Sequence, residues 1–399
     1  MQHDAGRGFS TRAIRAAGRS PRLDQEPTAV PIYQTATFRT ADSSELADIL
    51  TDRRQGYAYS RIANPTSAAL ADAVAEIEGS AEGFAFGTGM GAIFAALASQ
   101  MSAGDEVVAS NALYGSTRSL LDRELRRFGV ATRYVDATDL AGVEAAFTPA
   151  TRILYVETIS NPTIVVADLA PLAAIAHRNA AALVVDNTFA SPYLCRPAEL
   201  GADLVVESAT KWIAGHSDVM AGIVSGPPDR MAAVRALQVN TGGVVAPFSA
   251  FLVLRGLTTL AVRMDRHSST ALALAEYLER QDDVVRRVYY PGLATHPQAE
   301  VARRQLRTGG GMLAFDLGSR AAGTAFLDAL EIGERTASLG SVHTIAVHPP
   351  STTHRQLDEA GLERAGIAPG LVRMSVGLED ADDLLGDLAR ALDVVRAAV

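Results

Sequence analysis

The sequence predicts an α/β protein, with a mostly parallel central sheet in a large domain and a smaller α+β domain at the C-terminal end. First, short apolar runs without strict alternation recur between helical stretches, which is typical of strands buried on both faces of a parallel sheet. Second, the C-terminal part mixes shorter strand and helix patterns. Third, the chain of 399 residues exceeds the ~250–300 residues that one hydrophobic core usually holds.

The large domain is expected to begin with a helix. Leu70, Val74 and Ile77 recur at helical spacing after Asn64, and Gly79 is expected to end the helix. Candidate strands follow at residues 83–86, 106–109, 132–135, 153–157, 183–186, 204–207 and 222–225. Helices between them are expected at residues 91–101, 116–128 and 168–179. Because ligands of open α/β sheets lie at the carboxyl ends of the strands, residues just after each strand are the first candidates for chemistry.

The N-terminal segment is expected to be an arm. Pro21, Pro27 and Pro31 interrupt it, and residues 30–39 have an extended pattern. Such an arm cannot bury its apolar side chains alone, so we expect it to pack on another domain or another subunit. We place the arm at residues 1–62, the large domain at residues 63–256 and the small domain at residues 257–399.

The C-terminal segment predicts the smaller domain. A long helical stretch follows Pro247 and runs through Met264 toward Leu278. Strands are expected at residues 284–289, 312–316, 341–347 and 371–375, and a closing helix at residues 380–398. The length of the first helical stretch indicates a connection out of the sheet domain.

Composition narrows the class of protein. Hydrophobic residues make up 48% and charged residues 20%, an ordinary globular balance that excludes disorder. Lys and Arg total 36 against 45 Asp and Glu, and the net charge of −9 argues against binding to nucleic acid or to an anionic membrane. No apolar run reaches the ~18 residues of a membrane helix. The single cysteine, Cys195, cannot form an intramolecular disulfide or a cysteine-based zinc site, which fits a cytoplasmic enzyme.

The strongest local signal is the motif Ser208-Ala209-Thr210-Lys211, directly after the strand at residues 204–207. An ammonium group is costly to bury unpaired at the end of a core strand. A covalent imine with pyridoxal phosphate removes that charge and makes the lysine an anchor. Ser208 and Thr210 would then offer hydroxyl groups to a phosphate. The alternative is a surface lysine at a strand end, which this motif alone does not exclude.

Two further signals lie at the ends of strands in the same sheet. Asp186 ends the run at residues 183–186, where a carboxylate can pair with a protonated pyridine nitrogen, cap a helix or form a structural ion pair. A glycine-rich turn at residues 86–91, FGTGMG, leads from a strand into a helix, where free backbone N–H groups bind anions. This turn is neither GxGxxG nor a P-loop, so by itself it is a weak signal for a phosphate site.

Two side chains outside these motifs are candidates for cofactor binding. Tyr114 lies beyond the strand at residues 106–109, where it could stack on a flat ring or be an ordinary loop tyrosine. Arg61 lies on the arm beside Tyr59, where it could clamp a phosphate on a neighbouring subunit or be a surface charge. For each of these two residues, the sequence around it does not distinguish cofactor binding from an ordinary surface position.

Arg373 lies inside an otherwise apolar strand. Its guanidinium group is expected to pair either with an internal carboxylate or with a substrate carboxylate that accepts hydrogen bonds from two of its nitrogens. A metal site is not expected at His343, His348 and His354, because their spacing does not place them on one face and no carboxylate pattern completes the set.

Taken in order, these motifs resemble the cysteine/methionine-metabolism family of pyridoxal phosphate-dependent enzymes. The family includes methionine γ-lyase, cystathionine γ-lyase, cystathionine γ-synthase and the O-acylhomoserine sulfhydrylases. The matching segments cover nearly the whole chain, at residues 8–12, 59–61, 64–66, 87–90, 157–158, 161–162, 185–188, 209–211, 215–218 and 372–379. The resemblance implies a fold-type I architecture, with an arm, a cofactor domain and a small domain, assembled as a homotetramer of catalytic dimers.

The resemblance also implies roles for individual residues. Lys211 would carry the cofactor and move protons as general base and acid, Asp186 would pair with the pyridine nitrogen, and Tyr114 would stack on the ring. The residues expected to hold the phosphate are Gly89, Met90, Ser208 and Thr210, with Tyr59 and Arg61 from the partner subunit. The residues expected to bind the α-carboxylate of a small-molecule amino-acid substrate are Asn161, Ser338 and Arg373.

The chemistry that the resemblance implies is γ-elimination on a sulfur amino acid. Methionine, homocysteine or a related thioether would give 2-oxobutanoate, ammonia and a thiol. The first alternative is γ-replacement, in which a thiol or sulfide is joined to an O-acylhomoserine. The second is a pyridoxal phosphate-binding protein without catalytic activity, against which the completeness of the motifs argues.

Two departures from the family pattern bear on the substrate. Ser116 stands where methionine γ-lyases typically carry a cysteine, which weakens the expectation of methionine cleavage. His343 stands where cystathionine-handling members usually carry a glutamate, which argues against cystathionine. Both positions are therefore candidates for substrate contact. Residues 348–354 are more similar to methionine γ-lyases and sulfhydrylases, so the γ-lyase interpretation is favoured.

Overall fold

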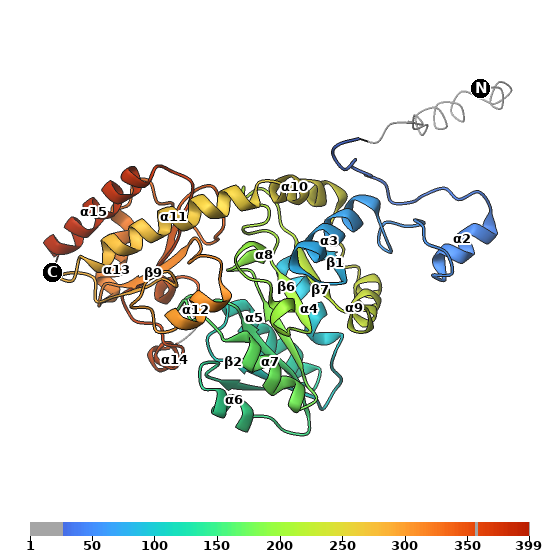
Figure 1. Cartoon of the computed structure of the whole chain (residues 1–399), viewed down its shortest axis with the longest axis horizontal. Coiled ribbons are helices and arrows are strands. Elements are labelled where there is room, and N and C mark those ends of the chain that lie inside the picture. The colour runs from blue at the N-terminus through green and yellow to red at the C-terminus, as the bar shows by residue number, and fades with distance from the viewer. Residues whose placement is uncertain (1–26, 356–357, 399) are drawn as a thin grey trace. The chain divides into compact units, whose positions relative to one another are not determined.

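The computed structural model describes residues 27–355 and 358–398 (Figure 1). The chain divides into two units, Met1–Pro31 and Ile32–Val399, and every element below belongs to the second unit. The motif at residues 8–12 lies outside the described residues, as does Pro21. In the arm, residues 32–39 lack helix and strand apart from one bridge between Thr37 and Tyr59. Helix α2 (Ser43–Leu50) follows and was not predicted.

In the described part of the chain, seven strands form a central sheet in the order β1-β7-β6-β5-β4-β2-β3. They are β1 (Glu82–Phe86), β2 (Glu106–Ser110), β3 (Ala131–Val135), β4 (Thr151–Glu157), β5 (Ala182–Asp186), β6 (Leu204–Glu207) and β7 (Gly222–Gly226). Strand β7 runs antiparallel to β1 and β6, whereas the other neighbouring pairs are parallel. The predicted class is confirmed, and each predicted strand end agrees within two residues.

Helices pack on both faces of this sheet. Leu154 of β4 belongs to a buried cluster that includes α7 (Leu169–Arg178), and the next residue, Tyr155, belongs to a cluster that includes α4 (Gly89–Ala98). Because both faces are covered, β2, β5, β6 and β7 are buried at every position. This explains why their sequences are continuous apolar runs without alternation.

Of the remaining helical segments of the large domain, only those at residues 65–78 and 115–125 correspond to predicted helices. The remaining segments are α3 (Pro65–Glu78), α5 (Gly115–Ser119), η1 (Leu120–Leu125), α6 (Leu140–Ala145), α8 (Ser191–Leu194), η2 (Pro197–Leu200) and α9 (Pro228–Thr241). Asn64 caps α3 by accepting the backbone N–H of Thr66 at 3.0 Å, and Gly79 ends it in the left-handed region with φ 74°. The predicted helix at 116–128 is α5 followed by η1, a π-helical segment.

The small domain contains an antiparallel sheet, which among the described residues has four strands in the order β10-β11-β9-β8. The strands are β8 (Arg287–Tyr289), β9 (Met312–Asp316), β10 (Ile345–Val347) and β11 (Leu371–Ser375). Its helical segments are α11 (Leu260–Glu279), α12 (Ala299–Gln305), α13 (Arg320–Ala329), η3 (Pro349–Ser351), α14 (Glu359–Arg364) and α15 (Ala381–Ala398). Figure 1 shows α11, α13 and α15 near β9.

Four predictions for this region need correction or remain open. The strand predicted at residues 284–289 begins only at Arg287, because residues 282–284 form a turn. The long helical stretch is two helices, α10 (Pro247–Leu257) and α11, separated at residues 258–259. The predicted strand at 341–347 is confined to β10, so residues 331–344 form a loop that reaches the large domain. The domain boundaries at residues 62 and 256 stay a prediction.

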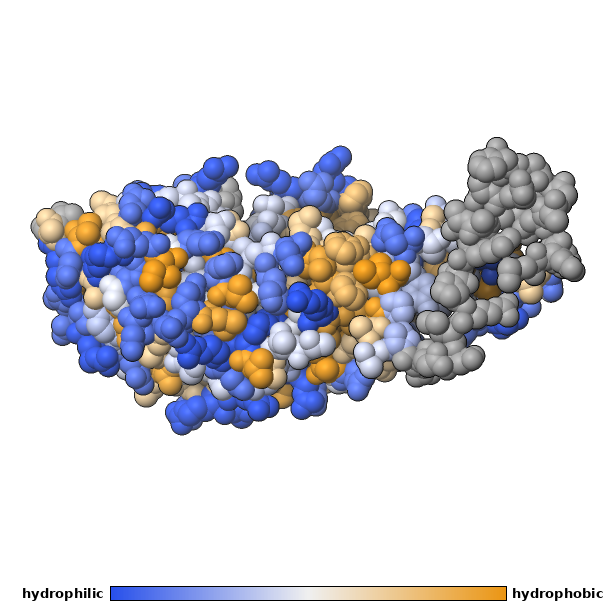
Figure 2. Space-filling model, turned by 90° about the horizontal axis from the view of Figure 1, so that it is seen from above, coloured by the Kyte–Doolittle hydropathy of each residue, from blue (hydrophilic) through white to orange (hydrophobic). Residues whose placement is uncertain are grey.

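Hydrophobic side chains gather on one face of the molecule over the region of α10 (Figure 2). Phe248 of α10 belongs to this region of the chain, and 55% of its surface is exposed. Within the described residues, no helix combines the length and the apolar character needed to cross a membrane.

Candidate active site

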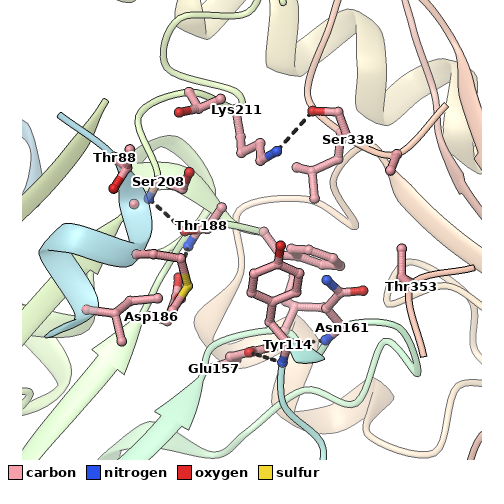
Figure 3. Close-up of a pocket in the computed structure, with 18 of the residues that line it drawn as sticks. Thr88, Tyr114, Glu157, Asn161, Asp186, Thr188, Ser208, Lys211, Ser338 and Thr353 are labelled. Atoms are coloured by element: carbon pink, nitrogen blue, oxygen red, sulfur yellow. Dashed lines mark hydrogen bonds between the residues drawn. The ribbon is translucent and has the colours of Figure 1, made fainter. Parts of the chain in front are cut away.

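The carboxyl ends of β4, β5 and β6 border a cavity of about 360 Å³ (Figure 3). The other walls come from the first turn of α4, the residue before α5, the loop between α13 and β10, and β11. A cavity at this edge of the sheet is where a ligand of an α/β fold is expected.

Ten of the predicted site residues line this cavity. They are Gly89, Met90, Tyr114, Asn161, Asp186, Ser208, Thr210, Lys211, Ser338 and Arg373. Sequence positions as far apart as 89 and 373 thus come together in one place. Their individual roles stay predictions.

Four predicted residues lie outside the lining of the cavity. Tyr59, Arg61, Ser116 and His343 are all exposed. Arg61 donates to the backbone oxygen of Val239 at 2.5 Å, away from the cavity of its own chain. That Tyr59 and Arg61 act at the cavity of another copy of the chain, and that Ser116 and His343 contact the substrate, stay predictions.

The N-terminus of α4 forms one end of the cavity. Thr88 caps this helix by accepting the backbone N–H of Gly91 at 3.0 Å. The N–H groups at the start of the first turn have no acceptor within a helix, so they are available to an anion. A side chain at Gly89 would meet the Cβ and Oγ of Ser208 at 2.7 Å, so the glycine is required by this close approach. The first turn of α4 and the Ser208 side chain therefore form one continuous wall of the cavity.

The threonine hydroxyls of the cavity also organise the strand ends. Thr188 Oγ1 accepts the backbone N–H of Ser208 at 2.8 Å and thereby ties the end of β5 to the end of β6. Thr210 Oγ1 accepts the backbone N–H of Ala221 at 2.9 Å and donates to its carbonyl at 3.1 Å. The Thr210 hydroxyl is therefore held in place by the chain itself.

Asp186 is a buried carboxyl group without a basic partner. Its Oδ1 accepts the backbone N–H of Thr188 at 3.0 Å, and its Oδ2 accepts the hydroxyl of Tyr155 at 3.3 Å. In the described part of the chain, no ion pair includes it. Burial raises the pKa of the Asp186 carboxyl above its usual range. A protonated pyridine nitrogen in the cavity would supply the missing positive charge.

Lys211 is the only lysine in the sequence, beside 35 arginines. Its Nζ donates to the Ser338 hydroxyl at 2.9 Å (Figure 3). Burial and, second, the positive charge of Arg373 lower the pKa of the Lys211 ammonium to about 8. With this pKa, roughly a tenth of the side chains are neutral amine at pH 7, and this is the form that attacks a carbonyl or accepts a proton.

Arg373 is a buried guanidinium that, like Lys211, bonds Ser338. Nη1 donates to the Asn161 side-chain oxygen at 2.8 Å, Nη2 donates to the Ser338 carbonyl at 2.8 Å, and Nε has no partner among the described residues. Burial lowers its pKa to about 10. No ion pair in the described chain includes Arg373, so an internal carboxylate is not its partner. A substrate carboxylate is the remaining alternative from the sequence.

Sequence reasoning missed several lining residues. Glu157 and Thr188 stand at or just after the ends of β4 and β5, the positions where polar side chains were sought, and both lie in segments that carry the resemblance. Phe189 follows directly, with its ring centroid 5.9 Å from the guanidinium carbon of Arg373. Met220 comes from a loop without a signal in the sequence, and Thr353 lies in the stretch at residues 348–354, whose resemblance named no individual site residue.

The other candidate groups are accounted for by packing. Burial raises the pKa of the Cys195 thiol to about 12, so this thiol is not a nucleophile near neutral pH. His348 Nε2 lies 2.8 Å from the Pro369 carbonyl, an ordinary core hydrogen bond. The described residues contain no group of three or more His, Cys, Asp or Glu side chains placed to hold a metal ion.

Comparisons with known proteins agree with this geometry. The family described as Cys/Met metabolism PLP-dependent enzyme matches residues 10–393. An L-methionine gamma-lyase of Pseudomonas putida is 46% identical over 388 residues, covering 96% of this chain and 97% of that protein. An O-succinylhomoserine sulfhydrylase of Pseudomonas aeruginosa is 42% identical over 388 residues, covering 97% of this chain and 96% of that protein.

A solved structure gives the same result for the fold. A Campylobacter jejuni protein described as an O-acetylhomoserine (thiol)-lyase superposes with a TM-score of 0.90 at 30% identity, covering 94% of this chain and 97% of that one. That structure contains a lysine joined to the pyridoxyl 5'-monophosphate group.

Proposed function

Because the chain belongs to the Cys/Met metabolism family of PLP-dependent enzymes, we propose that it is a carbon–sulfur γ-lyase acting on L-methionine or a related thioether amino acid. The observation that carries this choice within the family is the 46% identity, over nearly the whole chain, to an L-methionine gamma-lyase. L-Methionine and water would give methanethiol, 2-oxobutanoate and ammonia.

The residues present fit pyridoxal phosphate. The first turn of α4 and Ser208 would hold the phosphate, and Asp186 would pair with the ring nitrogen. Tyr114 would stack on the ring, and Lys211 is the one lysine available for a covalent link. When bound, this cofactor supplies an electron-poor ring that takes up the electron pair released when the substrate loses its α-proton.

The side chains of the cavity would have separate roles in binding the substrate and transferring protons. Arg373, with Asn161 beside it, binds the α-carboxylate and so orients the substrate. The neutral amine of Lys211 accepts the α-proton, and its lowered pKa suits this role near neutral pH. Tyr114 accepts a proton from the substrate amino group. Ser338, which bonds both Lys211 and Arg373, keeps the base and the carboxylate site at a set separation.

A second candidate is γ-replacement with an O-acylhomoserine and a thiol. It is favoured by the 42% identity to an O-succinylhomoserine sulfhydrylase. Both reactions need the same base, ring and carboxylate site. They differ in whether a thiol nucleophile enters after the γ-substituent has left.

The deciding experiment is a substrate panel with the holoenzyme. Methionine, homocysteine, cystathionine and O-acetyl- or O-succinylhomoserine are incubated with and without added sulfide, and 2-oxobutanoate and thiol products are measured. Release of 2-oxobutanoate from methionine without added thiol supports the lyase. Thioether or homocysteine formation that requires both acylhomoserine and thiol supports replacement, and would overturn the first proposal.

Cofactor attachment is tested separately from the reaction. Lys211→Ala should remove the visible absorbance of the bound cofactor and abolish activity, because the chain has no other lysine. Trp212, the single tryptophan, follows Lys211 directly and is buried, so its fluorescence should be quenched when the cofactor binds to the wild-type protein. Wild-type protein that stays colourless after reconstitution would contradict the assignment.

We also infer an assembly in which two copies build each active site, within a homotetramer. Tyr59 and Arg61 lie outside the cavity of their own chain, and Tyr33, Tyr57 and Phe248 expose hydrophobic surface. Light scattering checks the mass. Mixing unfolded Lys211→Ala and Arg61→Ala chains and refolding them together should restore part of the activity, because mixed dimers contain one intact site. No restoration would contradict the shared site.

We infer a cytoplasmic location for the enzyme. The sequence contains one cysteine, which is buried, so folding does not depend on disulfide formation in an oxidising compartment. Cell fractionation with an antibody against the chain tests this, and recovery with secreted proteins would contradict it.

A further inference from the structure

Glu157 ends strand β4 and borders the cavity with a buried side chain, of which 6% is exposed. Both oxygens of its carboxyl group accept backbone hydrogen bonds. Oε1 accepts the N–H of Tyr114 at 2.6 Å, and Oε2 accepts the N–H of Asn161 at 2.9 Å (Figure 3). In the described part of the chain, no ion pair includes Glu157.

The two N–H groups belong to the segments that carry the ring and carboxylate sites. Tyr114 is the residue before α5, where no side-chain cap is formed, so its backbone direction depends on what its N–H contacts. Asn161 precedes Pro162, and its side-chain oxygen accepts from Arg373. One carboxyl group therefore sets the position of both segments, although they are 47 residues apart in the sequence, at positions 114 and 161.

This position completes a continuous chain of hydrogen bonds around the cavity. In order, its members are Lys211, Ser338, Arg373, Asn161, Glu157 and Tyr114. In Figure 3 Lys211 and Ser338 lie on one side of the cavity, and Tyr114, Glu157 and Asn161 on the other. Glu157 is the member that connects the carboxylate site to the tyrosine.

An acid at this position is costly, so packing alone does not account for it. Glu157 lies directly opposite Asp186 in the register of β4 and β5. Burial and, second, the charge of Asp186 raise the pKa of Glu157 well above its usual range, whereas the two N–H groups act in the opposite direction. An amide of the same shape would avoid this cost. It has one acceptor oxygen, however, so its NH2 group would face one of the two N–H donors.

We propose that Glu157 is a positioning residue, whose two oxygens hold Tyr114 over the cofactor ring and Asn161 against Arg373. It acts through these residues and not by contact with the reacting atoms. The inference takes its cofactor site from the proposed function but does not depend on which sulfur compound is the substrate. Loss of the hydrogen bond from either backbone amide should displace Tyr114 or Asn161 from its position, although the residue itself is still present.

The test compares Glu157→Gln with a matched control, Glu106→Gln. Glu106 is also a buried acid, on the neighbouring strand β2, and accepts from Thr151 at 3.0 Å and Arg133 at 3.1 Å. It begins its strand whereas Glu157 ends one, so it lies at the opposite edge of the sheet. Both variants lose a buried carboxyl group, and only Glu157→Gln should alter the cavity.

The first measurement uses apoprotein and is independent of activity. Hydrogen exchange followed by mass spectrometry should show faster exchange in peptides containing the Tyr114 and Asn161 amides in Glu157→Gln, with no change there in Glu106→Gln.

The second measurement uses holoenzyme. Glu157→Gln should change the visible circular dichroism of the bound cofactor and lower kcat/KM roughly 10- to 100-fold, with KM raised through Asn161 and kcat lowered through Tyr114.

Glu157→Asp is a second test variant, and it keeps the proposal testable if Glu157→Gln does not fold. It keeps two acceptor oxygens on a shorter side chain that cannot reach both amides, so its exchange and kcat/KM should fall between wild type and Glu157→Gln. Unchanged exchange at both amides, kcat/KM within twofold of wild type, or equal losses in Glu106→Gln would each overturn the inference. If the wild-type protein were inactive on every sulfur substrate, the proposed function would be refuted. The hydrogen-exchange data would still decide whether Glu157 positions Tyr114 and Asn161.

Discussion

The side-chain nitrogen of Lys211 lies 2.9 Å from the hydroxyl oxygen of Ser338, a residue 127 positions away in the sequence. The same serine accepts the guanidinium of Arg373 through its carbonyl at 2.8 Å. One residue of the loop between α13 and β10 therefore contacts both Lys211, which follows β6, and Arg373, which lies in β11.

Ser338→Ala should lower the pKa of Lys211 in the apoprotein below about 8. The hydroxyl accepts from the ammonium and so favours the charged form, and its loss leaves that form less stable. Because Lys211 is the only lysine, the pH dependence of amine labelling at this residue, followed by mass spectrometry, reports the pKa directly. Ser341→Ala, in the same loop but outside the cavity lining, should leave the profile unchanged. An unaltered profile in Ser338→Ala would contradict the prediction.

Arg373→Lys should raise KM for the amino acid without changing cofactor absorbance. Lysine keeps the charge but loses the fork that bonds Asn161 and Ser338 and holds a carboxylate with two parallel bonds. A charged hydrogen bond contributes roughly 1.5–3 kcal/mol, so kcat/KM should fall about 10- to 100-fold. Steady-state kinetics measure this effect. A loss confined to kcat would place Arg373 outside carboxylate binding.

Asp186→Asn should stabilise the apoprotein while removing most activity. Burial raises the pKa of this carboxyl, and Glu157 lies opposite it in the register, so the amide relieves an unfavourable buried acid. The same amide cannot neutralise a protonated ring nitrogen, so kcat should fall by about two orders of magnitude or more. Calorimetry of apoprotein and steady-state rates test the two effects. A lower apoprotein Tm with activity retained would contradict both.

Gly89→Ala should weaken cofactor binding. A Cβ at this position would lie 2.7 Å from the Cβ and Oγ of Ser208, so the first turn of α4 would have to move away from β6. We expect roughly a tenfold or greater rise in the dissociation constant, measured by quenching of Trp212 fluorescence. Gly386→Ala in α15 is the matched control, because a Cβ there meets nothing within 4 Å. This control should bind normally and gain about 0.5–1 kcal/mol in helix stability.

Glu78→Gln should change how stability depends on pH. Glu78 is fully buried, its Oε1 accepts from the side-chain amide of Asn187 at 3.2 Å, and burial raises the pKa of Glu78 from 4.5 to about 7. The folded protein therefore holds a proton that the unfolded chain releases at lower pH. Holding this proton stabilises the folded protein. The stabilisation is complete below pH 4.5 and is lost as the pH rises toward about 7.

The loss amounts to roughly 3 kcal/mol at most for Glu78, from a pKa change of that size. Glutamine stays neutral at all pH values, so the unfolding free energy of Glu78→Gln should decline less across this range than that of the wild type. Denaturant titrations at about pH 5 and pH 8 provide the comparison. Parallel declines in both proteins would show that this acid does not titrate on unfolding.

The parts of the fold predicted correctly were those encoded by neighbouring residues. Buried strands such as Ala182–Asp186 are continuous apolar runs, because helices cover both faces of the sheet. Lys211, Asp186 and Gly89 could be found because the carboxyl ends of parallel strands converge at one edge. Strand 341–347 was predicted too long because Val342 donates its backbone N–H to Gly215 of the large domain at 3.0 Å, so the segment before Ile345 does not join the small sheet.

The sequence by itself determined the α/β class, most strand positions and the cofactor, because each depends on a local pattern or an ordered set of motifs. Only the tertiary structure decided what each polar group faces. Arg373 finds Asn161 at a separation of 212 positions and no internal carboxylate in the described chain, and Glu157 joins Tyr114 to Asn161. Such pairings follow from the packing of elements far apart in the sequence, and no local pattern of residues specifies them.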